Sequence, residues 1–362
     1  MKILFVTPHF PPELGGVELY VFNLARGLQQ THHVEVVVVT SHADAKEQIV
    51  EEYHGIKVYR LPALLRVSNT PVHPLWYFAL KKIIREEKPD IINSHQPVMF
   101  IGDLAAWLAG EIPFVLTYHA GTMKKQKFLI DIVISLYETF ILPQTARKAT
   151  RIICVSHFVR DTLLKKYASK ITIISPGVNT SLYKPDSTVK REEKCVVFVT
   201  RYKTMYRIKG LYYLIDAVDQ LDGVKLRVIG ERDESASTNV EFVGVKQGEA
   251  LVEEIQKASV LVLPSLAHKE SFGMVLIEAM ACQTPVIGTQ SGGIPEVIRD
   301  NVDGFIVPSE DSRALALAIS KIVLDKELAA RMGQAGAAKV AEQFTWDICV
   351  DRTKEVFASC MK

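Results

Sequence analysis

Short runs of apolar residues alternate with helical patterns along almost the whole chain. The runs are mostly continuous, which is typical of strands buried on both faces in parallel sheets covered by helices. The expected strands are Ile3–Thr7, Val34–Thr40, Ile56–Leu61, Ile91–His95, Phe114–His119, Arg151–Ser156, Ile171–Ser175, Cys195–Arg201, Lys225–Gly230, Val240–Val245, Val260–Pro264, Pro285–Thr289 and Phe305–Val307. The pattern therefore predicts an α/β protein with two doubly wound parallel sheets.

The pattern is interrupted at the charged stretch Asp186–Lys194 and then restarts. A chain of 362 residues fits two domains of about 100 to 200 residues each. We therefore expect two Rossmann-like domains, residues 1–185 and 186–345, and a final helix in residues 346–362. Ligands of doubly wound sheets bind beyond the carboxyl ends of the strands. Two such sheets facing each other predict a ligand site in an interdomain cleft.

Composition adds two constraints. Apolar residues make up 48% of the chain, which is enough for two sizeable cores. The net charge of +2 is unevenly distributed: residues 1–184 carry 21 Lys and Arg against 15 Asp and Glu, and the remainder carries 22 against 26. Such asymmetry can mark an anionic partner of the first half, although a mixture of solvated faces is the commoner cause.

The cysteines and the apolar runs indicate a cytoplasmic protein. The five cysteines are odd in number and lack metal-ligand spacing, so we expect reduced thiols. The first apolar run, Ile3–Val6, is too short for a signal peptide. No segment has the roughly 18 to 20 uncharged apolar residues that cross a bilayer. Any membrane contact is therefore expected to be peripheral.

Two glutamates flank the start of an expected helix that opens at Ser271 and continues through Ala281. The first amides of a helix lack intrahelical acceptors, and with the helix dipole they favour an anion such as a diphosphate. Glu270 would then lie on the sugar side of the phosphate, and Glu278 over a turn further on, where a carboxylate can accept both ribose hydroxyls. The expected donor contacts here are Glu270, Ser271, Phe272, Gly273, Met274, Val275 and Glu278.

An isolated pair of glutamates at this spacing is usually two ordinary charges. The surrounding block is more specific, because it also contains Gly292–Val297 and Asp303–Pro308. With these segments the motif resembles the C-terminal half of the retaining glycosyltransferases of family four, and the resemblance covers nearly the entire chain. It implies the GT-B fold, in which two Rossmann-like domains face a cleft and the last helix crosses back onto the first domain.

A glycine pair follows the first expected strand. Gly15 and Gly16 precede a helical pattern, so their amides could contact a phosphate or the reacting groups. The loop lacks the spacing of a dinucleotide-binding or P-loop motif, which argues against a dehydrogenase or an NTPase. By itself a glycine pair is usually just a turn. The resemblance implies that Gly15 and Gly16 touch the donor phosphate and the acceptor pocket.

Basic residues that could neutralise a leaving diphosphate follow the first expected strand of the second domain. The family pattern places an arginine at the strand end and a lysine just before a helix-opening glycine, and Arg201 and Lys209 match these places. A guanidinium and an ammonium together can clamp phosphate oxygens as negative charge develops. This loop is longer than the usual form and has Thr200 where a glycine is usual, so Lys203 or Arg207 could share the role.

Three histidines fall at expected strand ends. The resemblance implies that His119 contacts the donor sugar, although a lone histidine is more often a packed or solvated residue. His9 and His95 lie at strand ends on the same expected edge and are weaker candidates for the acceptor side.

Several activities can be weighed against glycosyl transfer. Glycosidases use two carboxylates that flank one bond about 5 to 10 Å apart, whereas Glu270 and Glu278 are expected to hold opposite ends of one nucleotide sugar. A noncatalytic sugar-nucleotide-binding assembly partner would be expected to lack Glu270, Arg201 or Lys209, and all three are present. A GT-B epimerase remains an alternative, and a phosphorylase would need a pyridoxal lysine context that is not seen.

The resemblance implies transfer of a hexosyl unit with retention at the anomeric carbon. The expected route is same-face attack, in which the departing phosphate oxygen takes the proton of the acceptor hydroxyl. Because the sequence has no DXD pair placed to hold Mg²⁺, and cations with helix amides can stabilise the leaving group, we expect neither a metal nor a cofactor. The expected partners are a nucleotide sugar and a lipid, lipid-linked or other glycan acceptor, and no nucleic acid.

Residues 124–142 predict an interfacial helix. Three lysines in 124–127 precede a largely apolar helical segment with one narrow polar stripe. Such a helix can bury its apolar face in the lipid boundary while lysines meet anionic head groups. A second basic and aromatic stretch, Trp76–Phe78 with Lys81, Lys82 and Arg85, lies in the same domain. The segment could equally pack in the core or in a dimer.

Overall fold

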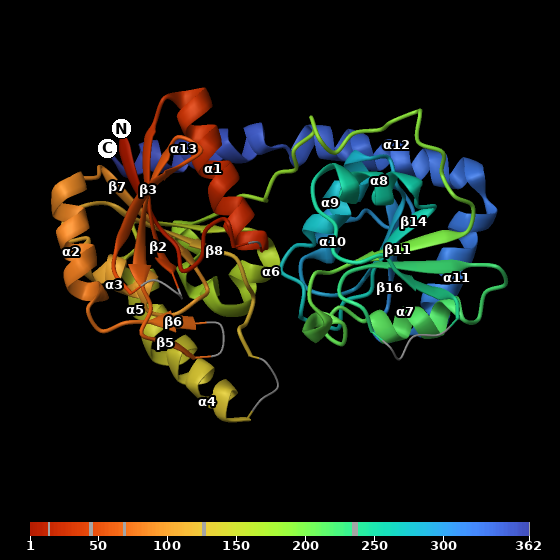
Figure 1. Cartoon of the computed structure of the whole chain (residues 1–362), viewed down its shortest axis with the longest axis horizontal. Coiled ribbons are helices and arrows are strands. Elements are labelled where there is room, and N and C mark those ends of the chain that lie inside the picture. The colour runs from red at the N-terminus through yellow and green to blue at the C-terminus, as the bar shows by residue number, and fades with distance from the viewer. Residues whose placement is uncertain (14, 43–45, 68–69, 125–127, 234–237, 362) are drawn as a thin grey trace. The chain divides into compact units, whose positions relative to one another are not determined.

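The computed structural model describes residues 1–13, 15–42, 46–67, 70–124, 128–233 and 238–361, and it divides into two compact units (Figure 1). Unit 1 contains Met1–Pro176 and Trp346–Lys362, and unit 2 contains Gly177–Thr345. The division lies before the predicted boundary at residue 185, because the intervening segment packs with the second unit. The Val178 amide donates to the Phe344 carbonyl at 2.8 Å, and Tyr183 packs against the core of unit 2.

Unit 1 is built on a sheet of eight strands in the order β10-β9-β8-β7-β1-β2-β4-β3. Its strands are β1 (Lys2–Val6), β2 (Glu35–His42), β3 (Ile49–Tyr53), β4 (Ile56–Pro62), β7 (Ile91–Gln96), β8 (Phe114–Tyr118), β9 (Arg151–Cys154) and β10 (Ile171–Ile173), and β5 (Leu65–Val67) pairs separately with β6 (Thr70–Val72). All seven predicted strands of this half are confirmed. The sequence pattern missed the edge strand β3, which pairs antiparallel to β4, because its first four residues are solvent-exposed and leave little apolar signal.

Helices cover both faces of this sheet (Figure 1). One face carries α2 (Trp76–Glu87), α3 (Ile101–Leu108) and α5 (Leu142–Lys148), and the other carries α1 (Gly16–His32) and the C-terminal helix α13 (Trp346–Cys360). The short helical segments α6 (His157–Val159), η2 (Arg160–Leu164) and η3 (Lys165–Lys170) lead into β10. Helices α1 and α13 approach closely at Gly27, where a Cβ atom would lie 2.4 Å from Val350.

Unit 2 is a fully parallel sheet in the order β13-β12-β11-β14-β15-β16. Its strands are β11 (Cys195–Val199), β12 (Lys225–Ile229), β13 (Val240–Phe242), β14 (Val260–Leu263), β15 (Val286–Thr289) and β16 (Gly304–Val307), all six of which the sequence pattern predicted. Its helical segments are η4 (Lys203–Met205), α7 (Leu211–Val218), α8 (Glu249–Lys257), α9 (Met274–Ala281), α10 (Ile294–Val297), α11 (Ser312–Leu324) and α12 (Lys326–Gln343). Two apolar clusters, one on each face, form its core.

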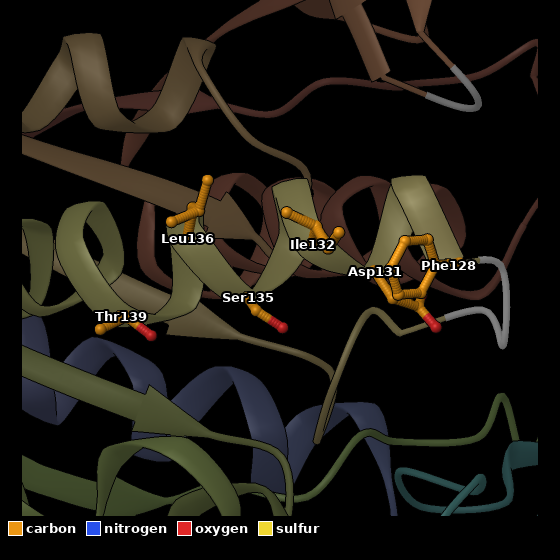
Figure 2. A pocket seen from close by; sticks show the side chains of 6 residues that line it. All are labelled: Phe128, Asp131, Ile132, Ser135, Leu136 and Thr139. Carbon is orange, nitrogen blue, oxygen red and sulfur yellow. The ribbon is translucent and has the colours of Figure 1, made fainter.

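The segment predicted as an interfacial helix forms α4 (Phe128–Leu136), a π-helical turn η1 (Tyr137–Ile141) and then α5. Phe128, Ile132 and Leu136 line a shallow hollow with Asp131, Ser135 and Thr139, members of the predicted polar stripe (Figure 2). Several apolar side chains of α4 and η1 are exposed, so burial of the whole segment in the core is wrong within this chain. Residues 125–127, which hold two of the three lysines, lie outside the described residues.

The described part of the chain contains no helix that is both long and apolar enough to span a bilayer. All five cysteines are free thiols, as predicted, and all but Cys360 are buried. Burial raises the pKa of the Cys154 thiol to about 12, which leaves it a poor nucleophile.

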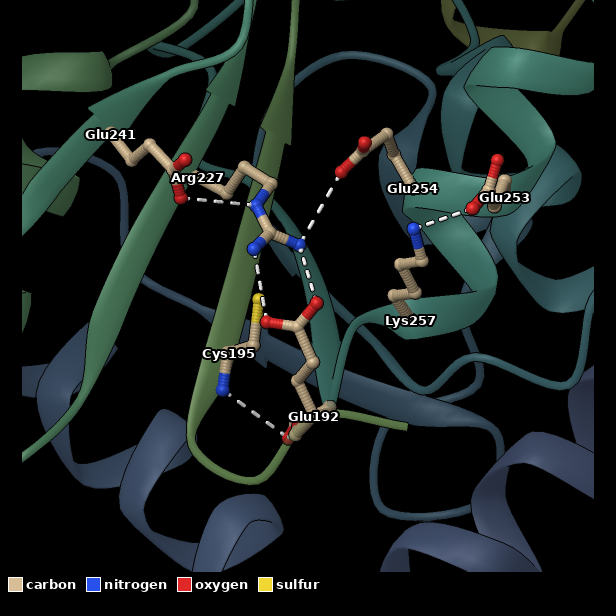
Figure 3. Close-up of polar contacts among 8 residues, drawn as sticks. Glu192, Cys195, Arg227, Glu241, Glu253, Glu254 and Lys257 are labelled. Carbon is tan, nitrogen blue, oxygen red and sulfur yellow. Dashed lines mark hydrogen bonds and ion pairs between the residues drawn. The ribbon is translucent and has the colours of Figure 1, made fainter. Parts of the chain in front are cut away.

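An ion-pair network joins strands β12 and β13, helix α8 and the segment before β11 at one edge of the unit 2 sheet (Figure 3). The Arg227 guanidinium on β12 donates to both carboxylate oxygens of Glu192 at 3.0 and 2.9 Å. It also lies 3.4 Å from Glu241 on β13 and 3.3 Å from Glu254 on α8. Only 15% of the arginine side chain and 16% of that of Glu254 are exposed, whereas Glu192 and Glu241 are 44% and 62% exposed. The pair with Glu254 is therefore the one that water screens least.

Replacing Arg227 with Met should lower the free energy of unfolding by about 1 to 3 kcal/mol, because it leaves the largely buried Glu254 carboxylate without its cation. Lys326→Met is the matched control. Its ion pair with Glu193 is of similar length, 2.6 Å, but both side chains are more than three-quarters exposed, so the expected cost is about 0 to 1 kcal/mol. Urea unfolding of the full chain measures both. Equal losses for the two variants would contradict this role of Arg227.

Candidate functional site

The candidate donor residues of unit 2 gather at the carboxyl edge of its sheet. β11 pairs with β14, and β14 pairs with β15, all in parallel. Arg201 follows β11, Glu270 follows β14, and Gly292 with Gly293 follows β15. Strands that run in parallel end at the same edge, which is where doubly wound sheets bind their ligands. The fold therefore brings together residues that lie up to ninety positions apart in the sequence.

Glu270 and Lys209 form an ion pair at this edge. The Nζ atom of Lys209 lies 2.5 Å from Oε2 of Glu270, and the Ser265 hydroxyl donates to the same oxygen at 3.2 Å. Only 8% of Glu270 is exposed. The sequence analysis gave the two residues separate ligands, the sugar and the phosphate, and it missed both their contact and the role of Ser265. An ammonium has three donors, so Lys209 can hold Glu270 and still donate to a phosphate oxygen.

Glycines fix the backbone of Glu270. Gly292 has φ +55°, and a Cβ atom there would lie 1.7 Å from the Glu270 carbonyl oxygen. The next residue, Gly293, donates its amide to that same carbonyl at 2.9 Å. On the other side Gly210, with φ +76°, lies directly against the Pro264 carbonyl. Side chains at these positions would collide with backbone, so the glycines are needed to hold the loop that carries Glu270.

Helix α9 begins three residues later than predicted, at Met274. Its N-cap, Gly273, has φ +98°, a conformation that cannot belong to a right-handed helix. Ser271 and Phe272 therefore lie in the preceding turn. Phe272 is buried against Phe344, with ring centroids 5.5 Å apart, so its side chain is an anchor rather than a ligand contact. No side chain caps α9, and the first-turn amides of Met274 and Val275 suit an anion.

Glu278 lies in the second turn of α9 and is partly buried. It shares a hydrogen bond with Tyr183, from the segment that the sequence analysis had placed in the first domain. Burial raises the pKa of Glu278 to about 7, although the bond from Tyr183 acts in the opposite direction. The carboxyl therefore titrates in the physiological range. Tyr183 was missed because nothing in its local sequence points toward a helix about a hundred residues away.

Arg201 and the loop after it supply the remaining cations. The Arg201 guanidinium lies over the Tyr202 ring, with Cζ 5.2 Å from the ring centroid, and the arginine is partly buried. Lys203, which the sequence analysis kept as an alternative phosphate ligand, pairs with Asp233 at 3.1 Å. The Lys203 side chain is 50% exposed and that of Lys209 is 23% exposed, so water screens the charge of Lys209 less.

In unit 1 a histidine pair lies where β7 and β8 end side by side. The Nδ1 atom of His95 lies 3.2 Å from Nε2 of His119, and the rings stack with centroids 5.4 Å apart. Burial lowers the pKa of His119 to about 3 and that of His95 well below its usual value, so both rings are neutral near pH 7. His95 is fully buried against Phe5 and Tyr20. Its predicted acceptor contact is therefore wrong, and it can act only by holding His119.

The glycine pair caps helix α1, with Gly15 as the N-cap and Gly16 as the first helical residue. A Cβ atom at Gly15 would lie 2.3 Å from the Glu18 carboxylate, whereas none of the described residues crowds Gly16. His9 lies 2.8 Å from Glu13, and ligand atoms of His9, Glu13 and Glu18 all lie within 4.8 Å of one another. The sequence analysis missed both glutamates. Among the described residues of this loop, Gly16 is exposed and has open space beside its Cα atom.

Comparisons with known proteins agree with this geometry. Residues 14–182 match the sequence family described as Glycosyltransferase Family 4, and residues 181–339 match Glycosyl transferases group 1. The chain is 26% identical to O-antigen chain mannosyltransferase C of Escherichia coli, over 100% of this chain and 99% of that protein. It is also 26% identical to the phosphatidyl-myo-inositol mannosyltransferase of Mycolicibacterium smegmatis, over 99% and 93%.

The fold is that of GT-B enzymes of known structure. The Anabaena protein HepE, solved in complex with UDP and glucose, superposes with a TM-score of 0.77. The two chains are 20% identical, and the match covers 99% of this chain and 100% of that one. The predicted fold class, two Rossmann-like domains of the GT-B type, is therefore confirmed.

The Glu278 carboxyl predicts a pH dependence of nucleotide-sugar binding. Ribose hydroxyls donate, so they favour the carboxylate, which forms as the pH rises through about 7. The affinity for UDP-glucose or GDP-mannose should rise about tenfold from pH 6 to pH 8. Both phosphates of a nucleotide sugar are esterified, so the ligand does not titrate in this range. Calorimetry measures the effect, and Glu278→Gln should abolish it. A flat profile for the unsubstituted protein would contradict the assignment.

Proposed function

The chain belongs to the family-four glycosyltransferases, and we propose that it transfers a hexosyl unit from a nucleoside-diphosphate sugar with retention at the anomeric carbon. The proposed acceptor is a hydroxyl of a lipid, a lipid-linked saccharide or another glycan. The observation that carries the proposal is the buried Glu270–Lys209 pair at the carboxyl edge of the unit 2 sheet. This pair combines an acceptor for sugar hydroxyls with a donor for phosphate in one place.

Each part of the donor has a counterpart in unit 2. Arg201 and Lys209 would neutralise the diphosphate with the first-turn amides of α9, because cations and helix N-termini both stabilise phosphate oxygens. Glu270 would accept hydroxyls of the hexose, and Glu278 would accept the two ribose hydroxyls. In unit 1, His119 would contact the donor sugar through a neutral ring, and Gly16 would bring open backbone to the phosphate.

The proposed reaction breaks the bond between the anomeric carbon and the phosphate oxygen and forms a bond from that carbon to the acceptor oxygen on the same face. The departing phosphate oxygen takes the proton of the acceptor hydroxyl, so no side chain has to act as a base. Negative charge grows on the diphosphate as the first bond breaks. Preorganised cations and amides stabilise that charge more in the transition state than in the bound substrate.

The names of the relatives support a glycan or lipid acceptor. One is a mannosyltransferase of the O-antigen chain and another acts on a phosphatidylinositol, and HepE was solved with UDP and glucose. Mannose and glucose donors on GDP and UDP are therefore the first to test. Mass spectrometry of the products, with and without a lipid extract, identifies the donor and the acceptor class. Release of an epimerised nucleotide sugar without an acceptor would favour the alternative of an epimerase.

The two glutamates should fail in different ways. Glu270→Gln should lower kcat about 100-fold or more, because it removes the charge that holds both the hexose and Lys209 in the transition state. Glu278→Gln should mainly raise the donor KM, by about tenfold for a weakened pair of ribose contacts. Steady-state kinetics, with the donor that mass spectrometry identifies, distinguishes an effect on kcat from an effect on KM. If either variant is as active as the unsubstituted enzyme, that glutamate does not belong to the site. If neither the variants nor the unsubstituted protein turn over any donor, the result favours a noncatalytic binder.

The two cations should hold the diphosphate without a metal ion. Arg201→Ala and Lys209→Ala should each weaken UDP or GDP binding by about 1 to 3 kcal/mol, the size of a lost charge-assisted contact. Lys203→Ala is the control in the same loop, and its loss should be small because half of that side chain is exposed, where water screens its charge. Calorimetry with and without EDTA measures all three. Binding or turnover that strictly requires Mg²⁺ would contradict metal independence.

A further inference from the structure

An apolar cavity of about 500 Å³ opens on the surface of unit 1, within the size range of about 300 to 1,000 Å³ that is usual for small-molecule sites. Leu104 and Trp107 of α3 form one wall, and Val133, Leu136, Phe140 and Ile141 of the α4–η1 segment form the other. Several of these side chains are exposed, among them Trp107 at 47%, Val133 at 52% and Phe140 at 60%. So much exposed apolar surface in one hollow indicates a binding site.

The polar groups at the base of the cavity bond one another. The Asp103 carboxylate accepts from the Thr145 hydroxyl at 2.6 Å, from the Tyr137 hydroxyl and the Gln96 amide at 3.1 Å, and from the Phe100 backbone amide at 3.0 Å. These bonds occupy the groups that a polar ligand would need. The cavity therefore favours a hydrocarbon chain over a sugar or a nucleotide, because only apolar contact remains to be gained.

Two backbone irregularities shape this cavity. Phe100, at its rim, has φ 83° and ψ −74°, the strained γ-turn conformation that a bulky side chain rarely adopts. The opposite wall contains the π-helical turn η1, and such turns are frequent at functional sites. Strain of this kind persists where the surrounding structure and a function require it. Here it places an exposed aromatic ring at the mouth of the cavity.

Strand β7 separates the cavity from the histidine pair, because successive side chains of a strand point to opposite faces of the sheet. Gln96, which bonds Asp103 and Tyr137 at the base, directly follows His95 in that strand. His95 in turn contacts His119. A hydrocarbon chain in the cavity would therefore lie on the opposite face of the sheet from the His95 ring, next to the same end of β7.

The α4–η1 wall carries the half-buried carboxylates Asp131 and Glu138 and no cation, whereas the other helices on this face of the sheet carry mostly basic side chains. Over α2, α3 and α5, which are described throughout, the exposed ionisable side chains are five cations and one carboxylate, namely Lys81, Lys82, Arg85, Arg147, Lys148 and Glu86. Cations around an apolar hollow complement a lipid whose head group is anionic. They do not complement a second copy of this basic face.

We propose that the cavity between α3 and the α4–η1 segment binds the hydrocarbon chain of a lipid acceptor with an anionic head group. The proposal rests on the proposed glycosyl transfer and names the acceptor class for it. The hydrocarbon chain would lie between Trp107 and Phe140, and the head group would remain at the rim, on the face of the sheet whose helices α2 and α5 carry exposed cations. The exposed face of α4 beyond the cavity is a separate surface, and the hydrocarbon chain of the lipid does not need to occupy it.

Fluorescence titration of the full chain with decyl phosphate, below its micelle concentration, tests the proposal. Trp107 lines the cavity, so its emission should shift to the blue and saturate as the decyl chain of the ligand binds. Trp107→Phe should remove that signal. Methyl phosphate, which has the head without the chain, should not bind. Octyl glucoside, which has a chain and an uncharged head, should bind more weakly than decyl phosphate.

Phe140→Glu and Val133→Glu place a carboxylate in the cavity wall at exposed positions, where folding tolerates them, and should weaken decyl phosphate binding at least about tenfold. Ile132→Glu is the matched control on the same helix: Ile132 is 44% exposed but faces the hollow of Figure 2 instead. Its affinity should stay within about twofold of the unsubstituted protein. In the transfer assay, the loss in the cavity variants should fall on the KM of a lipid acceptor and spare the donor KM.

Unsaturable binding, equal binding by all variants, or binding of methyl phosphate as tight as that of decyl phosphate would overturn the proposal. Sedimentation of a dimer that Phe140→Glu dissociates would assign the cavity to a second copy instead. The titration contains no nucleotide sugar, so its failure leaves glycosyl transfer standing. Chain binding without any transfer would instead sink the proposed function and leave the cavity as a lipid site.

Discussion

The arrangement of the candidate donor site depends on one buried contact, the ion pair between Glu270 and Lys209. A carboxylate that is 8% exposed would be costly without a cation or donors beside it. Lys209 reaches it from the loop after β11 and Ser265 from the end of β14. The loops must therefore approach to backbone contact, which is possible only because Gly210 and Gly292 leave room for neighbouring carbonyls. The charge pair and the glycines are thus parts of one constraint.

The candidate residues at the strand ends of unit 1 include a neutral pair, His95 and His119. This histidine pair is buried among aromatic rings and stays uncharged, so it can bind a ligand through hydrogen bonds but not through an ion pair. Tyr20 packs edge-on against His119 and also contacts Trp346 of α13. The C-terminal helix therefore supports the histidine pair from behind. The cations and carboxylates that we propose for the donor lie in unit 2, whereas unit 1 contains the neutral histidine pair and the apolar cavity.

Local sequence predicted much of this and missed what depends on distant neighbours. All thirteen predicted strands exist, because continuous apolar runs report burial on both faces directly. The exposed edge strand β3 left no such signal. At the candidate site, motifs predicted Glu270, Arg201 and Lys209 one by one, but the ion pair of Glu270 with Lys209 joins two loops and has no periodicity to reveal it. The bond of Tyr183 to Glu278 was hidden for the same reason, and the burial of His95 is a property of the packed core.

The cavity on unit 1 forms because helix α3 lies against the exposed apolar face of the α4–η1 segment. The amphipathic pattern of residues 128–142 predicted exposed apolar side chains, but a pattern cannot distinguish a face that lies on a surface from one that closes a hollow. That distinction comes from α3, whose Trp107 and Leu104 face the segment, and from Asp103, whose carboxylate is surrounded by donors of the same unit. Because those donors already bond Asp103, a ligand in the cavity can gain only apolar contacts. A hydrocarbon chain is the ligand that needs nothing more.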